Sequence, residues 1–161
     1  MKGKYNILMR VNTDGKRNEN ELSEEQLKEV IEYAVSLGMS QDKIYYVDYD
    51  FTAYGKAFDL LRIGTDVLPA DVKLSKNPND NISLKGAIAH EIVGHREAAL
   101  KNITQENDLL EEVQASIRAA RFTPDLNYHE RIILIKDALT RLKNNKIKLR
   151  DVRDKLHINE R

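Results

Sequence analysis

The chain has 161 residues, with 26 basic and 26 acidic side chains, so its formal net charge is zero. This length is sufficient for one domain with its own hydrophobic core, and we predict a single domain over residues 1–161. Because the charges balance, we expect no nucleic-acid footprint and no attraction to an anionic membrane surface. The sequence has no cysteine, which excludes disulfides, thiolate metal sites and cysteine nucleophiles.

No apolar run in the sequence is long enough to form a membrane-spanning helix. The first 16 residues lack the long apolar core of a secretory signal peptide. We therefore expect either a cytoplasmic protein or one that is secreted as part of a larger chain.

The first half of the sequence predicts strands and one helix. An apolar run over 5–11 ends in an Asn-Thr-Asp-Gly turn and predicts a strand. Ser23 begins a helix with a capping box to Gln26, and Gly38 ends it. Two further strands are predicted at 44–49 and 58–63, with 51–55 as the connection between them.

The second half is helical. After a break at Leu68-Pro69 and a polar loop, Ser83 is a suitable N-cap for the next helix. Later helices are predicted at 105–122, 128–142 and 149–156, and the apolar positions of the second are Ile132, Ile133, Ile135, Ala138, Leu139 and Leu142. Strands first and helices afterwards indicate an α+β fold, with a small N-terminal sheet and one helix followed by a helical C-terminal half.

The segment 86–99 holds two of the four histidines, with Glu91 directly after the first. His90 and His95 are five residues apart, whereas the common zinc-peptidase motif separates its histidines by four. On a regular helix a spacing of five turns the two rings about 140° apart. A π-bulge would bring them to the same face, and Gly94 has no Cβ to oppose that deformation. Either the helix is bulged and holds a metal, or the two histidines are unrelated.

A catalytic zinc needs a third protein ligand, which without cysteine must be a carboxylate or a histidine. Glu112 is the best candidate, because the small Ala115 lies on nearly the same helix face and would let this helix approach the first one closely. Glu111 is the second choice. The alternative is that both glutamates belong to an exposed polar edge.

The two segments HEIVGH and EEVQAS together resemble the gluzincin metallopeptidases, and most closely the dipeptidyl peptidase III family. The resemblance implies a zincin-like active-site helix, with His90, His95 and Glu112 as Zn²⁺ ligands and Glu91 as the general base. It also implies a peptide or protein substrate. This chain departs from the pattern at Ser116, where such families often have an acidic residue that orients a zinc-bound histidine.

The chain length and the stretch AIAHEIVGHREAA also resemble the C-terminal toxin domains of Rhs-type polymorphic toxins. That second resemblance implies a toxic effector domain with an immunity protein as its partner. The alternative to both is a non-catalytic protein-interaction domain, with a structural zinc or with no metal.

In the expected mechanism the ion lowers the pKa of its bound water toward about 7, and Glu91 takes the proton of that water. The oxyanion needs a further donor, for which His129, Tyr128, Tyr54 and Arg118 are the candidates. The strand at 58–63, if it lies at the edge of the sheet, would hold an extended peptide by strand addition.

Overall fold

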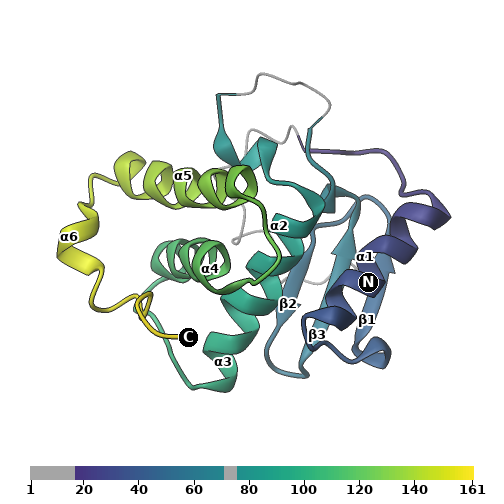
Figure 1. Ribbon diagram of the computed structural model, residues 1–161, viewed down its shortest axis with the longest axis horizontal. Helices are drawn as coiled ribbons and strands as arrows, with labels where there is room; N and C mark the ends of the chain where they lie inside the picture. Colours follow the sequence, from purple (N-terminus) through teal and green to yellow (C-terminus); the bar gives the residue numbers. More distant parts are fainter. Residues whose placement is uncertain (1–16, 71–75) are drawn as a thin grey trace.

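The computed structural model describes residues 17–70 and 76–161 and has the predicted α+β fold. A small sheet lies in the first half of the chain, and helices make up most of the rest (Figure 1). The strand predicted at 5–11 lies outside the described residues. No helix in the described ranges combines the length and the apolar character that crossing a bilayer requires.

The elements follow the chain in a simple order. The first half contains α1 (Glu24–Ser36), η1 (Gln41–Lys43), β1 (Ile44–Val47), β2 (Ala53–Gly55), β3 (Leu60–Gly64) and η2 (Thr65–Val67). The second half contains η3 (Pro78–Asn81), α2 (Leu84–Ala89), η4 (His90–Arg96), α3 (Glu97–Leu100), α4 (Asp108–Phe122), α5 (Tyr128–Asn144) and α6 (Leu149–Val152).

The described strands form one sheet in the order β1-β3-β2, in which β3 pairs parallel with β1 and antiparallel with β2. The condition for strand addition at 58–63, that this strand lies at a sheet edge, is not met, because β3 is the central strand. The predicted connection over 51–55 is also wrong in part, since Ala53–Gly55 forms β2. Alanine and glycine have weak strand preference, so this short strand depends on its pairing with β3.

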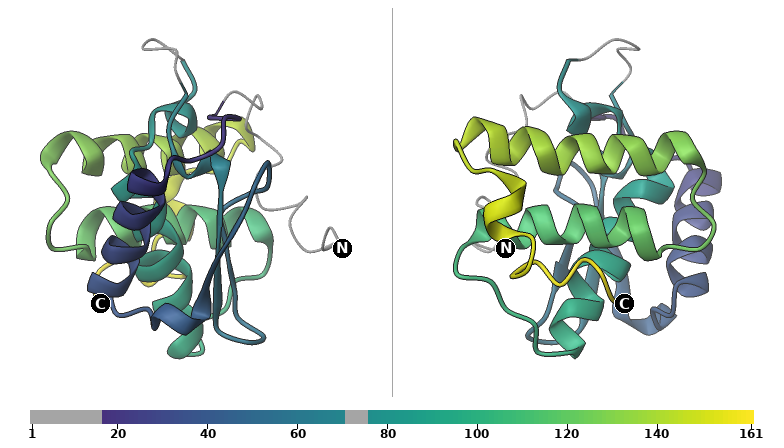
Figure 2. Two further views of the ribbon diagram at one scale, coloured as in Figure 1. Left: turned by 90° about the vertical axis from the view of Figure 1, so that its right-hand side faces the viewer. Right: turned by 60° about the vertical axis from the view of Figure 1, so that its left-hand side comes forward.

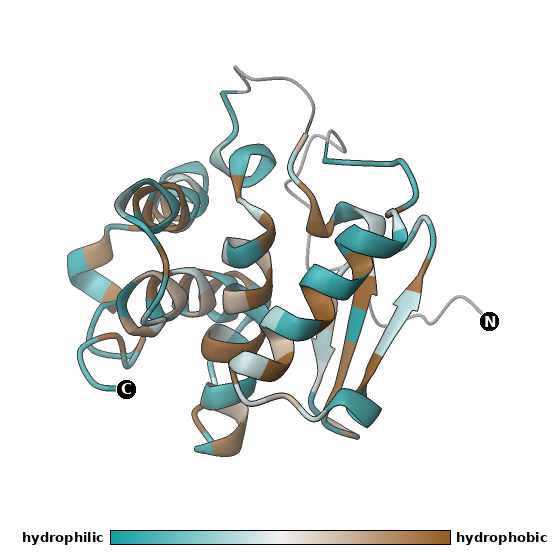
Figure 3. Ribbon diagram, turned by 45° about the vertical axis from the view of Figure 1, so that its right-hand side comes forward, coloured by the Kyte–Doolittle hydropathy of each residue, from teal (hydrophilic) through white to brown (hydrophobic). Residues whose placement is uncertain are grey.

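Helix α1 begins and ends as the sequence predicts. The Ser23 side chain accepts from the Gln26 N–H and the Gln26 side chain accepts from the Ser23 N–H, which completes the capping box. Gly38 follows the helix with a φ of 102°, a left-handed conformation that favours glycine. The hydrophilic side of α1 faces outward, while its buried residues pack with those of the sheet and α2 in one core (Figure 3).

Helices α2, η4 and α3 run on without a break, since the residues at both junctions keep right-handed helical φ and ψ angles. Helix α4 packs across this long helix, and α5 lies along α4 on its other side (Figure 2). A second apolar core joins α4, α5 and the C-terminal segment. The structure thus places α4 between the histidine helix and α5.

Several element boundaries differ from the predicted ones. Helix α4 begins at Asp108 rather than at 105, because the Asn107 side chain caps it by accepting from the Leu110 N–H. Strand β1 ends at Val47, and Tyr49 has a left-handed φ of 56°. Helix α6 ends at Val152, and the chain after it packs against α4.

Candidate metal centre

The two histidines lie at the two ends of a π-helical segment, η4, which spans His90–Arg96. The N–H of Glu97 donates to the carbonyl of Ile92, five residues back, as in a π-helix. This wider turn brings the two imidazoles to the same face, with their ring centroids 4.8 Å apart and their planes at 79°. The structure therefore has the bulged helix that the five-residue spacing required.

Gly94 also allows two helices to pack closely, a role that its place in the bulge does not by itself predict. A Cβ at Gly94 would lie 2.5 Å from the Ala115 carbonyl oxygen and 2.8 Å from the Ala115 Cβ. The small residues at 94 and 115 thus allow α4 to contact η4 directly. This close contact brings the preceding turn of α4, with Glu112, beside the two imidazoles.

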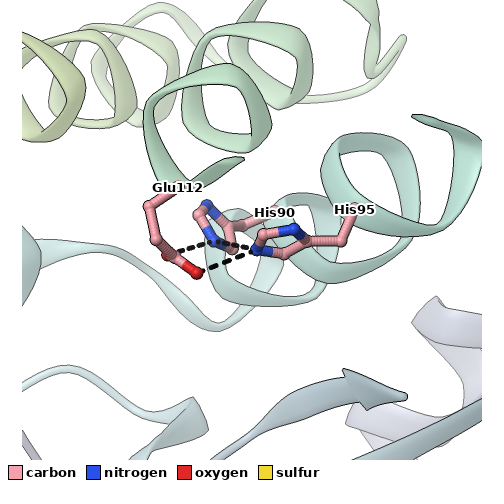
Figure 4. Close-up of side chains that lie close together, drawn as sticks. All are labelled: His90, His95 and Glu112. Atoms are coloured by element: carbon pink, nitrogen blue, oxygen red, sulfur yellow. Dashed lines mark hydrogen bonds and ion pairs between the residues drawn. The ribbon is translucent and has the colours of Figure 1, made fainter. Parts of the chain in front are cut away.

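His90, His95 and Glu112 form a cluster that could hold a metal ion (Figure 4). His90 Nε2 lies 3.1 Å from His95 Nε2 and 3.1 Å from Glu112 Oε2, and His95 Nε2 lies 3.1 Å from Glu112 Oε1. Ligand atoms about 2.0–2.2 Å from a tetrahedral ion are separated by about 3.3 Å, which these distances nearly match. The cluster is enclosed, since His90 is 7% exposed and Glu112 is 6% exposed.

Within the cluster, His95 and Glu112 each favour the charged form of the other. Burial lowers the pKa of His95, but the charge of Glu112 and its hydrogen bond outweigh this effect and raise the pKa to about 9. Burial favours protonation of Glu112, yet the charge of His95 and hydrogen bonds from both imidazoles hold the pKa of Glu112 well below its usual value.

Glu91 is buried beside the cluster but is not part of it. Its Oε2 accepts a hydrogen bond of 2.9 Å from the backbone N–H of Tyr54 in β2. Its negative charge is among the causes that raise the pKa of His95. The sheet therefore fixes the orientation of Glu91, while the π-helix fixes its position.

A second polar group ties the β2–β3 hairpin to the end of η4. The Tyr54 hydroxyl donates to Asp59 Oδ1 over 2.7 Å, and Arg96 donates to both oxygens of Asp59, over 2.8 and 3.2 Å. The hydrogen bonds from Arg96 and Tyr54 lower the pKa of Asp59. Because Arg96 directly follows His95, this group fixes the hairpin next to the cluster.

The other predicted candidates lie elsewhere. His129 and Tyr128 are exposed at the start of α5. Arg118 is buried, and its guanidinium donates to the carbonyl oxygens of His157 and Glu160 in the C-terminal segment. Tyr54 lies by the site, but its hydroxyl is engaged with Asp59. Glu111 is outside the cluster, so Glu112, the first choice of the two glutamates, is the one that faces the histidines.

Two residues of α5 also belong to the surroundings of the cluster, and the sequence reasoning missed both. Asp137 and Arg141 are buried and form an ion pair of 3.1 Å. The buried face of α5 consists of residues 133, 134, 137, 138, 141 and 142. Two charged residues at helical spacing within an apolar stripe were a signal for a polar site. Leu139, predicted to be on that stripe, is 42% exposed.

Comparisons of this chain with protein-family models, with curated proteins and with solved structures find no match.

Proposed function

We propose that this protein is a zinc-dependent peptidase in which His90, His95 and Glu112 hold the ion and Glu91 is the general base. The observation that carries the proposal is the meeting of two imidazoles and one carboxylate, beside a further buried carboxylate on the same helix. Imidazole and carboxylate together suit zinc, and two histidines with one glutamate leave a fourth position for water or substrate.

The residues around the cluster support this chemistry. Zinc in such a site lowers the pKa of the water that it binds toward about 7. Glu91 follows His90 in the sequence, and the Tyr54 N–H orients its carboxylate, which in this proposal takes a proton and returns it to a leaving amine. A carboxylate that is already fixed in position loses little freedom in the reaction.

A peptide is the substrate class that the sheet favours. Strand β2, not β3, is the edge strand beside η4, and its Tyr54 N–H already reaches Glu91. Because Glu91 engages this N–H, an extended peptide would add to this edge through other backbone groups of β2, and it would lie against the general base. We therefore propose that a peptide adds to β2 rather than to β3.

The experiment compares zinc-loaded wild type with Glu91→Gln on a mixed fluorogenic peptide library. Glu106→Gln, an exposed substitution of the same kind, is the matched control. We expect both variants to bind one zinc per chain, and only Glu91→Gln to lose cleavage, by about 100-fold or more. Undiminished cleavage by Glu91→Gln would contradict the proposed role of Glu91.

A structural zinc is the second candidate, because the cluster is almost fully enclosed. It predicts that zinc-loaded wild type cleaves no peptide of the library and that chelation unfolds the protein. The peptidase proposal predicts instead that chelation abolishes cleavage while most of the helical circular dichroism signal remains.

A toxic effector activity is a further part of the proposal and rests on the sequence resemblance alone. Expression in the bacterial cytoplasm should then stop growth with the wild type but not with Glu91→Gln. Normal growth with well-folded, zinc-loaded wild type would remove this part and leave the peptidase proposal intact.

A further inference from the structure

The outer nitrogen of His90 begins a chain of hydrogen bonds that leads away from the cluster to α5. His90 Nδ1 lies 2.9 Å from the Ser116 Oγ, and this hydroxyl donates to Asp137 Oδ2 over 2.8 Å. Ser116 is fully buried and Asp137 is 2% exposed. Three elements, η4, α4 and α5, each supply one member of this chain.

The direction of these bonds follows from the position of the cluster. His90 Nε2 faces His95 and Glu112, so it is the nitrogen that would bind an ion and must then carry no proton. The proton of the neutral ring is then on Nδ1, which donates to Ser116. The hydroxyl can accept this bond because its own proton is given to Asp137.

Burial of the Asp137 carboxylate costs desolvation free energy, and packing alone does not explain why a charged residue lies at this position. A buried ion pair such as Asp137 with Arg141 often stabilises a protein no more than apolar residues of the same size would. Arg141 Nη2 also lies 3.9 Å from Glu112 Oε2. Asp137 thus contacts Ser116, and Arg141 lies close to a member of the cluster. The ion pair is therefore placed where it can act on the ligands.

We propose that Asp137 is a positioning residue of the metal centre, which acts on His90 through the Ser116 hydroxyl. This inference rests on the proposed zinc site. This chain of hydrogen bonds fixes the orientation and the tautomer of the His90 ring. It also makes Nε2 a more basic ligand for the ion. Ser116 alone would do this weakly, but with Asp137 behind it the hydroxyl transmits the effect of a carboxylate.

The test measures the zinc dissociation constant of wild type, Ser116→Ala, Asp137→Asn and the double variant by competition with a chelating dye. Ser36→Ala and Asp154→Asn, at exposed positions, are the matched controls. We expect each single variant to bind zinc about 10- to 100-fold more weakly and the controls to bind it unchanged. The double variant should lose no more than Ser116→Ala, because both residues act through one chain.

A nuclear magnetic resonance measurement on the zinc-loaded protein tests the direction of the bonds even if affinity changes are small. The wild type should show a slowly exchanging, downfield Nδ1 proton of His90, which Ser116→Ala abolishes. Coordination of zinc through Nδ1, or equal zinc affinity in all variants, would overturn the inference. Additive losses in the double variant would also overturn it, since Asp137 would then act through Arg141 on Glu112.

The outcomes separate this inference from the proposed function. Failure of the wild type to bind zinc would remove both. Tight zinc binding by the wild type with no effect of Ser116→Ala or Asp137→Asn would remove the hydrogen-bond chain alone.

Discussion

Gly94 lies so close to Ala115 that a methyl group on its α-carbon would stand 2.5 Å from the Ala115 carbonyl oxygen. The contact joins the π-helix to α4, and it sets how near Glu112 comes to the two imidazoles. The geometry of the cluster of His90, His95 and Glu112 therefore depends on the absence of a side chain at Gly94, which is not itself a member of the cluster.

The substitution Gly94→Ala should destabilise the protein by about 1–3 kcal/mol, because the added methyl forces two backbones apart. It should also weaken zinc binding, since Glu112 moves away with α4. Urea denaturation and a zinc titration measure the two effects. Gly55→Ala is the control, because a Cβ there meets only the Leu60 carbonyl at 3.8 Å. Equal stability of the Gly94 and Gly55 variants would contradict the close contact.

Zinc should stabilise the folded chain, because its ligands come from two different elements and meet only in the native structure. At a free zinc concentration about 100 times the dissociation constant, the stabilisation should be about 2.7 kcal/mol. Thermal unfolding with zinc and after chelation measures it. A midpoint that does not depend on zinc would argue against the site.

Zinc binding at pH 7 should release close to one proton. The pKa of His95 is raised to about 9 in the metal-free protein, so the ring is protonated at neutral pH and must lose that proton to bind an ion. The apparent zinc affinity should therefore rise about tenfold from pH 7 to 8 and level off as the pH passes about 9. Calorimetry in buffers of different ionisation enthalpy counts the protons, and a heat that is the same in all buffers would disprove the prediction.

The stability of the metal-free protein should also depend on His95. A group whose pKa is higher in the folded state stabilises the fold fully below its unfolded value of 6.5, and this contribution is lost as the pH rises through about 9. Wild type should thus lose stability over this range relative to His95→Gln. Parallel stability curves for the two proteins would contradict the raised pKa.

Much of this arrangement could be predicted from sequence, because several signals are local. The Ser23 capping box and the left-handed Gly38 follow from residues within one turn of each other. The five-residue spacing of His90 and His95 required a bulge if they were to share an ion, and the π-helix is there. The small Ala115 near Glu112 predicts a close approach of the two helices, and the contact of Ala115 with Gly94 confirms that approach.

The parts that sequence reasoning missed depend on contacts between distant segments. Strand β2 has no strand pattern of its own and exists through its pairing with β3. The Tyr54 N–H reaches Glu91 across 37 positions of the chain. Asp137 is 21 residues from Ser116, and only the packing of α5 on α4 brings them together. Contacts of this kind have no fixed sequence separation, so no pattern in the sequence predicts them.

The proposed metal site is tested most directly by the zinc content of purified wild type, His95→Ala and His129→Ala. His129 is an exposed histidine outside the cluster, so His129→Ala is the control in which a histidine is removed but the proposed ligands are kept. We expect about one tightly bound zinc per chain in wild type and His129→Ala, and little in His95→Ala. A wild type without zinc, or a His95→Ala variant that binds zinc equally well, would rule out this site.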